Sequence, residues 1–286
     1  MATRRPDFLA IGNLCFDLVD GERILGGSSA YSAILAHNLG YRTAIVTSVG
    51  EDFPLALLPP GIEIHPQRGE ETTTFVNRET AFGRVQFVHS VAAPLDIAAI
   101  PPERLSAQIA YLCPILDDFD PDGLLARLDA ELIGVAPQGW MRTVGDDGRV
   151  RKRRFFALEQ VVPRADVVLV SDEDVTEADL DRLISRARLL VVTHGRDGAE
   201  IFLDGGTELV TVSAFVREEI DSTGAGDVFG AAFLIRYHET RDPEEAGRFA
   251  AWAASFVVQG EGTEAIPTRD DVLSLPAEEE EELAAF

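Results

Sequence analysis

The stretch from Asp221 to Asp227, Asp-Ser-Thr-Gly-Ala-Gly-Asp, contains residue types that can do chemistry. Gly224 and Gly226 allow the backbone to turn tightly and to approach a ligand closely. The almost wholly apolar run at 228–234 that follows predicts a buried helix. Free amides and the dipole at such a helix start form a site for an anion. A carboxylate beside that site can take the proton of an attacking hydroxyl, so the stretch is typical of phosphoryl transfer.

The same residues also have a purely structural interpretation, which local physics alone slightly favours. Glycines commonly precede helices, and an acidic side chain in a first turn interacts favourably with the helix dipole. The spacing of Gly224, Gly226 and Gly230 is G-x-G-x-x-x-G, which differs from the dinucleotide fingerprint. The sequence also lacks a G-x-x-x-x-G-K-[ST] phosphate loop.

A family resemblance shifts the balance toward chemistry. The segment 221–227 resembles the D-T-x-G-A-G-D signature of the PfkB (ribokinase-like) carbohydrate kinases. A second segment resembles the other signature of that family: Gly26-Gly27 opens a helix of small residues, and the next strand ends in Val-Gly-Glu-Asp at 49–52. The resemblance covers nearly the whole sequence. It implies a three-layer α/β sandwich with a largely parallel central sheet and a small β lid.

Polar residues follow the predicted first strand, 8–12. Open α/β sheets bind ligands at the carboxyl ends of their strands, so Asp17 and Asn13 are candidates for contacts with substrate hydroxyls. A solvated turn is the equally plain alternative for Asp17. The resemblance implies that Asp17 and the Gly26-Gly27 edge hold a sugar.

The lid is expected at about 14–25 and 72–90. Few residues separate Asp17 from Gly26, so we expect a lid smaller than that of many ribokinases. A small lid makes a lid-swapped dimer doubtful and leaves monomer and homodimer open. It also resembles the compact inositol-kinase and nucleoside-kinase branches.

The segment Gln138-Gly139-Trp140-Met141-Arg142 is similar to a Q-G-aromatic-x-R pattern of inositol-kinase-like members. The resemblance places Gln138 and Arg142 near the substrate. The alternative is that Trp140 packs in the core and Arg142 lies on the surface.

The donor side is assigned by resemblance as well. Thr193, Gly195 and Gly198 match a V-T-x-G-x-x-G segment that lines the nucleotide in the family. Gly260 lies where the family places its adenine pocket. These four residues are therefore expected to bind the nucleotide.

Two metal sites are implied by the same resemblance. Ser171 to Asp174 stands where the family has N-x-x-E, so Asp174 is a candidate for the Mg²⁺ shell through water, with helix capping as the structural alternative. Asp221 and Thr223 are candidates for a monovalent cation such as K⁺.

Composition limits the partners. The sequence of 286 residues has a net charge of −24, which argues against nucleic acid and anionic membranes as partners. Two cysteines, Cys15 and Cys113, are too few for a disulfide scaffold or a structural zinc site. Arg4-Arg5 is followed by Pro-Asp and no apolar run approaches about 18 residues, so we expect a cytoplasmic protein without a signal peptide. One domain is expected over 1–275, followed by an acidic end at 276–286.

The sequence therefore predicts an ATP-dependent kinase for a hydroxyl of a sugar or cyclic polyol, with an inositol-like compound favoured. Asp227 is the expected general base, and the amides of Gly224, Ala225 and Gly226 are expected to hold the transferring group of Mg-ATP. A nucleoside kinase is the first alternative, in which Tyr31 and Phe16 would stack on the base. A non-catalytic ligand-binding relative is the second, although the intact 221–227 segment speaks against it.

Overall fold

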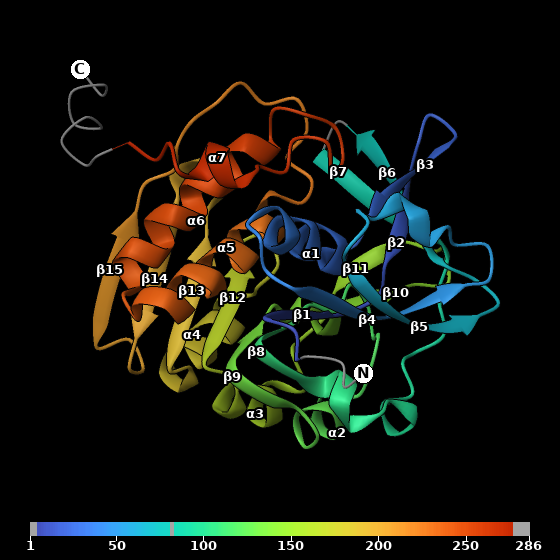
Figure 1. The fold of residues 1–286 in the computed structure, drawn as a ribbon, viewed down its shortest axis with the longest axis horizontal. Helices are drawn as coiled ribbons and strands as arrows, with labels where there is room; N and C mark the ends of the chain where they lie inside the picture. Colours follow the sequence, from blue (N-terminus) through green and yellow to red (C-terminus); the bar gives the residue numbers. More distant parts are fainter. Residues whose placement is uncertain (1–4, 81–82, 277–286) are drawn as a thin grey trace.

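The computed structural model describes residues 5–80 and 83–276. These residues form a nine-stranded central sheet with helices on both faces and a separate four-stranded sheet at one end (Figure 1). This arrangement confirms the predicted three-layer sandwich with a small β lid. Residues 81–82 of the predicted lid segment 72–90, and all of the predicted acidic end 276–286 except Pro276, lie outside the described residues.

The central sheet is largely parallel, as predicted. Every neighbouring pair is parallel except β13 with β14 and β14 with β15, which form an antiparallel edge. In spatial order the strands are β15 (Glu208–Val212), β14 (Ala199–Leu203), β13 (Leu189–Thr193), β12 (Val167–Ser171), β9 (Asp129–Val135), β8 (Ser106–Leu112), β1 (Phe8–Ile11), β4 (Thr43–Gly50) and β5 (Glu63–Gly69).

Helices cover both faces of this sheet, which explains why its strands are apolar on both sides. In β1, Phe8 and Ala10 belong to one core while Leu9 and Ile11 belong to the other. The first core packs under α1 (Ser28–Asn38), α5 (Ala225–Thr240) and α6 (Pro243–Val257), with α7 (Arg269–Val272) beside α6. The opposite face carries α2 (Pro121–Leu125), α3 (Leu158–Val161) and α4 (Glu177–Arg186).

The lid sheet has the order β3 (Glu22–Gly26), β2 (Cys15–Val19), β6 (Thr73–Thr80) and β7 (Gly83–Ser90). Both predicted lid segments therefore contribute two strands. The short connection from Asp17 to Gly26 is a hairpin whose turn, Asp20-Gly21, has positive φ at both residues. Asp17 itself lies inside β2 and not in a loop after the first strand, because β2 begins only four residues after β1 ends.

A further hairpin connects the lid to the body. Its strands are β10 (Arg142–Val144) and β11 (Val150–Lys152), and a bridge between Phe87 and Arg149 joins it to β7. None of the helices within the described ranges is long and apolar enough to cross a membrane.

Candidate active site

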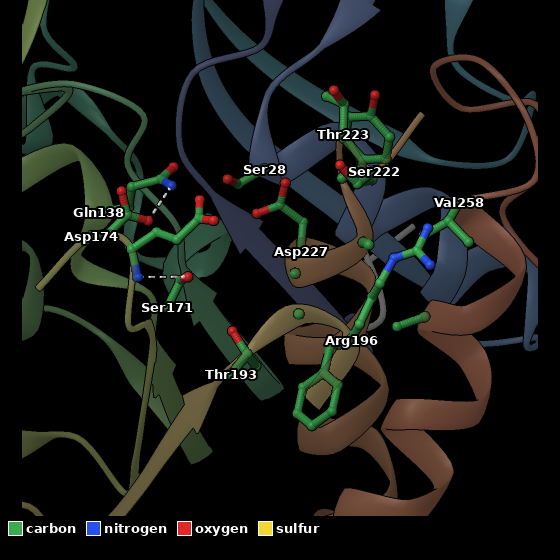
Figure 2. Close-up of a pocket in the computed structure, with 18 of the residues that line it drawn as sticks. Ser28, Gln138, Ser171, Asp174, Thr193, Arg196, Ser222, Thr223, Asp227 and Val258 are labelled. Atoms are coloured by element: carbon green, nitrogen blue, oxygen red, sulfur yellow. Dashed lines mark hydrogen bonds between the residues drawn. The ribbon is translucent and has the colours of Figure 1, made fainter. Parts of the chain in front are cut away.

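A cavity of about 1050 Å³ lies between the lid and the carboxyl edge of the central sheet. Its lining comes from lid strands β2, β6 and β7, from the ends of β12 and β13, and from the starts of α1 and α5. This is the edge at which an open α/β sheet is expected to bind its ligands. Figure 2 shows Ser28, Asp174, Thr193 and Asp227 converging on the cavity from these different elements.

The start of α5 forms an amide-lined turn, although the amide of Ala225, one of the three predicted to hold the transferring group, donates to the Ser222 carbonyl at 3.2 Å. Gly224 caps the helix with a left-handed backbone, φ +84°, and a Cβ at this position would collide with the Tyr31 ring. Only glycine satisfies both requirements. The first amide that bonds one turn back belongs to Val228, whose acceptor is the Gly224 carbonyl at 2.9 Å. The amides of Gly226 and Asp227 precede it at the cavity, where the positive end of the helix dipole favours an anion.

Asp227 stands in the first turn of α5, and its carboxylate is partly exposed to the cavity. Burial raises the pKa of Asp227 to about 6, and the carboxylates of Asp174 and Asp17 also raise it. A hydrogen bond from the Ser28 hydroxyl and the positive charge of Arg142 act in the opposite direction. Asp227 is therefore mostly ionised at neutral pH, yet it is a stronger base than an ordinary aspartate.

The lid supplies polar side chains to the cavity. Asp17 in β2 accepts a hydrogen bond from Asn77 Nδ2 in β6 at 3.3 Å, and Gln86 Nε2 in β7 donates to Asn77 Oδ1 at 3.1 Å. Asp17 was predicted, whereas Asn77 and Gln86 were missed. In the sequence, Asn77 and Gln86 are recognisable only as polar residues in the middle of lid strands. Their place in the site becomes clear only when the lid is folded over the body.

On the body side, the structure brings Gln138, Arg142 and Asp174 together. Gln138 Nε2 donates to Asp174 Oδ2 at 2.6 Å, and Arg142 Nη2 donates to Asp174 Oδ1 at 3.4 Å. Arg142 Nη1 also donates to Gln86 Oε1 of the lid at 3.5 Å. Both oxygens of Asp174 thus already accept protein hydrogen bonds, which was not expected of a residue assigned to a metal shell. We call Asp17, Asn77, Gln86, Gln138, Arg142 and Asp174 the polar network.

Of the predicted residues Asn13, Gly26 and Gly27, Gly27 is the one that is among the described lining residues of the cavity. Gly27 lines the cavity and caps α1 with φ +99°. Gly26 leaves space for the Asp17 carboxylate, with which a Cβ at position 26 would collide. Asn13 is not among the described residues that line the cavity. The side-chain Oδ1 of Asn13 accepts a hydrogen bond from the Ser48 backbone amide at 3.0 Å, and the backbone amide of Asn13 donates to the buried Asp118 carboxylate at 3.0 Å. Asn13 therefore orders the chain after β1.

The donor end is built from strand ends. Thr193, Gly195 and Gly198, which were predicted to bind the nucleotide, line the cavity, and both glycines have positive φ. Gly260 lies after the end of α6, is not among the described lining residues, and packs near Ala265. The predicted nucleotide contact at Gly260 therefore has no geometric support.

His194 was given no role from the sequence, but the structure places it between two carboxylates. Its Nδ1 lies 2.8 Å from Asp172 Oδ2 and its Nε2 lies 3.2 Å from Glu200 Oε2. Burial lowers the pKa of His194, but these two carboxylates outweigh burial and raise it above its ordinary value. The His194 ring therefore links the ends of β12 and β13 to β14 at the donor end.

An apolar slot extends the donor end. Its walls are the loop at 214–217 and residues of α6, including Ala251 and Ala254, with Val258 just beyond the helix. Arg217 lines this slot, and its guanidinium lies 3.9 Å from the ring centroid of Phe256. These apolar walls suit a planar group better than they suit a phosphate.

The predicted metal positions are not preformed protein cages. Within residues 5–80 and 83–276, no three His, Cys, Asp or Glu side chains are grouped so that they could hold a metal ion. Asp172 and Glu173 line the cavity beside Asp174, which fits a Mg²⁺ ion that arrives on donor phosphates and keeps much of its water. Asp221 Oδ1 accepts from the Thr223 amide at 3.0 Å, and Thr223 lines the cavity. The Mg²⁺ and K⁺ assignments stay predictions.

The sandwich, the lid and the Asp227 turn together define a small-molecule kinase. Residues 158–269 match the family described as pfkB family carbohydrate kinase. Over these residues the chain is similar to this ribokinase-like family, whose members are phosphotransferases with a hydroxyl group as acceptor. Members of the family use a nucleotide or pyrophosphate as donor.

The chain is similar to relatives that differ in their acceptors. It is 27% identical to a nucleoside kinase of Methanothermobacter thermautotrophicus over 90% of this chain and 91% of that protein. It is also 27% identical to an inositol 3-kinase of Oryza sativa subsp. japonica over 79% of this chain and 61% of that protein. A pyrophosphate-dependent kinase of the ribokinase family, solved with a pyrophosphate analog and myo-inositol, superposes with a TM-score of 0.73 at 24% identity over 93% of this chain and 99% of that one.

Proposed function

We propose that this protein transfers the γ-phosphoryl group of a nucleoside triphosphate to a hydroxyl of a neutral cyclic polyol or sugar, with an inositol-like compound favoured. The observation that carries the proposal is the position of Asp227. Its carboxylate faces the cavity in the first turn of α5, beside the amides that would hold the transferring group.

The acceptor hydroxyl would hydrogen-bond to the Asp227 carboxylate, while other hydroxyls engage Asp17 and Asn77 beneath the lid. Even with a pKa of about 6, Asp227 is far less basic than an alkoxide. The proton therefore moves late, when the oxygen already shares its electrons with phosphorus. The amides at the start of α5 stabilise the charge on the transferring group. A magnesium ion bound with the donor would neutralise part of the phosphate charge.

Charge supports a neutral acceptor over a phosphorylated one. The acceptor end contains the carboxylates of Asp17, Asp174 and Asp227, and Arg142 already pairs with Asp174. A phosphate group on the acceptor would meet these carboxylates without a free cation of its own in the polar network. Polar donors and acceptors in this number match a ring with several hydroxyls.

The apolar slot supports a nucleotide as donor over pyrophosphate. Alanines of α6 and the backbone of 214–217 form a surface on which a base can lie, and pyrophosphate has no group to fill it. Pyrophosphate remains the alternative because a structurally similar kinase uses it.

A nucleoside kinase is the second candidate. Phe75 and Tyr31 line the acceptor end, so an aromatic wall is available for a base. A relative of similar length is a nucleoside kinase. Phe16, the other predicted stacking residue, is buried against Phe53 at 5.0 Å between ring centroids and is not among the described lining residues.

The test is ADP release from Mg-ATP across polyols, sugars, sugar phosphates and nucleosides, with the Asp227→Asn variant in parallel. We expect turnover with a neutral polyol or sugar, and a kcat about 10²- to 10⁴-fold lower in the variant. A strong preference for nucleosides would select the second candidate. Retained kcat in Asp227→Asn would refute the base, and lack of turnover with all compounds, despite tight binding, would favour the ligand-binding relative.

A further inference from the structure

Arg142 is the member of the polar network that connects the lid to the body. Its Nη1 reaches Gln86 of β7 at 3.5 Å and its Nη2 reaches Asp174 at 3.4 Å. The side chains of Arg142 and Asp174 are 19% and 18% exposed, so water screens their attraction only partly. Both distances lie at the long end of the hydrogen-bond range, and a small movement of the lid toward the body would shorten the distance from Gln86 to Arg142.

The polar network reaches both ligands from this centre. On the lid, Gln86 bonds Asn77, and Asn77 bonds Asp17 at the acceptor end. In the body, Asp174 follows β12 directly, next to Asp172 and Glu173 at the donor end. Gln138 holds the second oxygen of Asp174 at 2.6 Å, so Asp174 has a fixed partner on one side and an adjustable partner on the other.

We propose that Arg142 is a positioning residue that couples the two ends of the cavity, so that acceptor and donor strengthen each other's binding. An acceptor that engages Asp17 and Asn77 brings Gln86 toward Arg142, and Arg142 in turn fixes Asp174 beside the donor. The coupling is reciprocal, because a donor that orders Asp174 also orders the lid. The proposal rests on the proposed function. It requires an acceptor bound beneath the lid and a donor whose phosphates lie at the start of α5.

This role differs from the direct substrate contact predicted for Arg142. A direct contact would affect the affinity for the acceptor alone. A coupling role affects how far one ligand changes the affinity for the other, which is a separate measurable quantity.

The test is a binding cycle measured by titration calorimetry. The Kd of Mg-AMP-PNP, a non-hydrolysable ATP analogue, is determined with and without saturating myo-inositol, or the compound that gives turnover in the panel. We expect the acceptor to tighten binding about fivefold or more in the wild type. Arg142→Gln and Gln86→Leu should each bring this factor close to one.

Arg151→Gln is the matched control. Arg151 lies on β11 of the adjacent hairpin and pairs with exposed Asp147 at 2.6 Å, away from the polar network. It should keep the wild-type coupling factor. Gln86→Leu also protects the test if Arg142→Gln does not fold, since it replaces a neutral lid side chain. A variant Arg142→Gln that weakens acceptor binding but keeps the wild-type factor would overturn the proposal.

A second measurement needs no acceptor and therefore separates this proposal from the proposed function. Amide hydrogen exchange at 85–90 of the lid is followed with and without Mg-AMP-PNP. Slower exchange in the wild type and in Arg151→Gln, but not in Arg142→Gln, supports the coupling even if no acceptor is turned over. Equal slowing in all three proteins refutes it. If AMP-PNP does not bind, the proposed nucleotide donor fails, and both measurements are made with methylenediphosphonate, a pyrophosphate analogue.

Discussion

The two ends of the cavity are built on different principles. The donor end consists of strand termini and a helix start, fixed by the left-handed backbone of Gly224 and by the side-chain contacts of His194 with Asp172 and Glu200. The acceptor end is formed by side chains from the lid and the body, which meet in the hydrogen bond from Arg142 Nη1 to Gln86 Oε1 at 3.5 Å. The donor end is therefore preorganised, whereas the acceptor end is completed by the position of the lid. This difference fits a family that keeps its reaction and changes its acceptor.

Gly224→Ala should give the largest effect at the donor end. The new methyl group collides with Tyr31, and the left-handed backbone adds about 1–2 kcal/mol of strain. Because misplaced amides no longer match the transferring group, kcat should fall about 100-fold, which is more than the change in acceptor Kd caused by displacing the Tyr31 ring.

Gly21→Ala is the control for this substitution. Gly21 has a similar φ of +87° in the lid turn, but a methyl group added there would meet no atom within 4 Å. It should show the backbone strain without the loss of kcat. A comparable loss of kcat in both variants would show that the Gly224–Tyr31 contact does not organise the donor end.

The pH dependence of the wild type should report Asp227. Its pKa is raised to about 6, and only the ionised form accepts a proton. kcat/KM should therefore be constant above about pH 7 and should fall about tenfold per unit below pH 6. An acidic limb near pH 4 in steady-state rates at saturating donor would contradict the described surroundings of Asp227.

His194→Gln should change the KM of the donor alone, and this effect should be smaller than that of Gly224→Ala on kcat. The pKa of His194 is raised, so the ion pairs with Asp172 and Glu200 are complete below about pH 6.5 and are lost as the pH rises through the folded-state pKa. The donor KM of the wild type should rise about threefold across that range, as expected for partly exposed pairs. The variant should show the higher KM at every pH. A change in the acceptor KM instead would contradict the assignment of His194 to the donor end alone.

Asp227→Asn should stabilise the fold slightly. A carboxyl whose pKa is higher in the folded state costs folding energy at every pH above its unfolded value, and the full cost applies above pH 6. Removing that charge should gain roughly 1 kcal/mol at pH 8, after allowance for the water that reaches the cavity. Calorimetry should show a Tm higher by about 2 °C or more. An unchanged or lower Tm would mean that the Asp227 charge is well compensated.

The sequence predicts the Gly224 turn and helix α5 because their requirements are local. A left-handed turn at Gly224 and a carboxylate three residues later can be recognised in seven residues, and the apolar run after them defines α5. The central sheet was also predictable, because strands buried on both faces are continuous apolar runs such as 189–193. The family resemblance joined these segments into one architecture.

The acceptor end was less predictable because it depends on contacts across long sequence distances. Asn77 and Gln86 acquire meaning only where the lid meets Arg142, 56 residues beyond Gln86. Asn13 directly follows a strand of the site, but its side chain turns to the Ser48 amide, which the sequence does not indicate. Asp174 was predicted as a Mg²⁺-shell residue, and Gln138 and Arg142 as residues near the substrate, but the hydrogen bonds that join these three side chains were not foreseen.

Helices α1 and α5 are held against each other at the cavity. The Tyr31 ring of α1 packs on Gly224, and Ser32 Oγ donates to the Asp227 carbonyl at 3.4 Å. The two helix starts therefore behave as one rigid body, which carries the base and the Gly27 edge together. An engineer who wishes to change the acceptor could accordingly exchange strands β6 and β7 as a unit, and the catalytic geometry would be inherited unchanged from the helices beneath them.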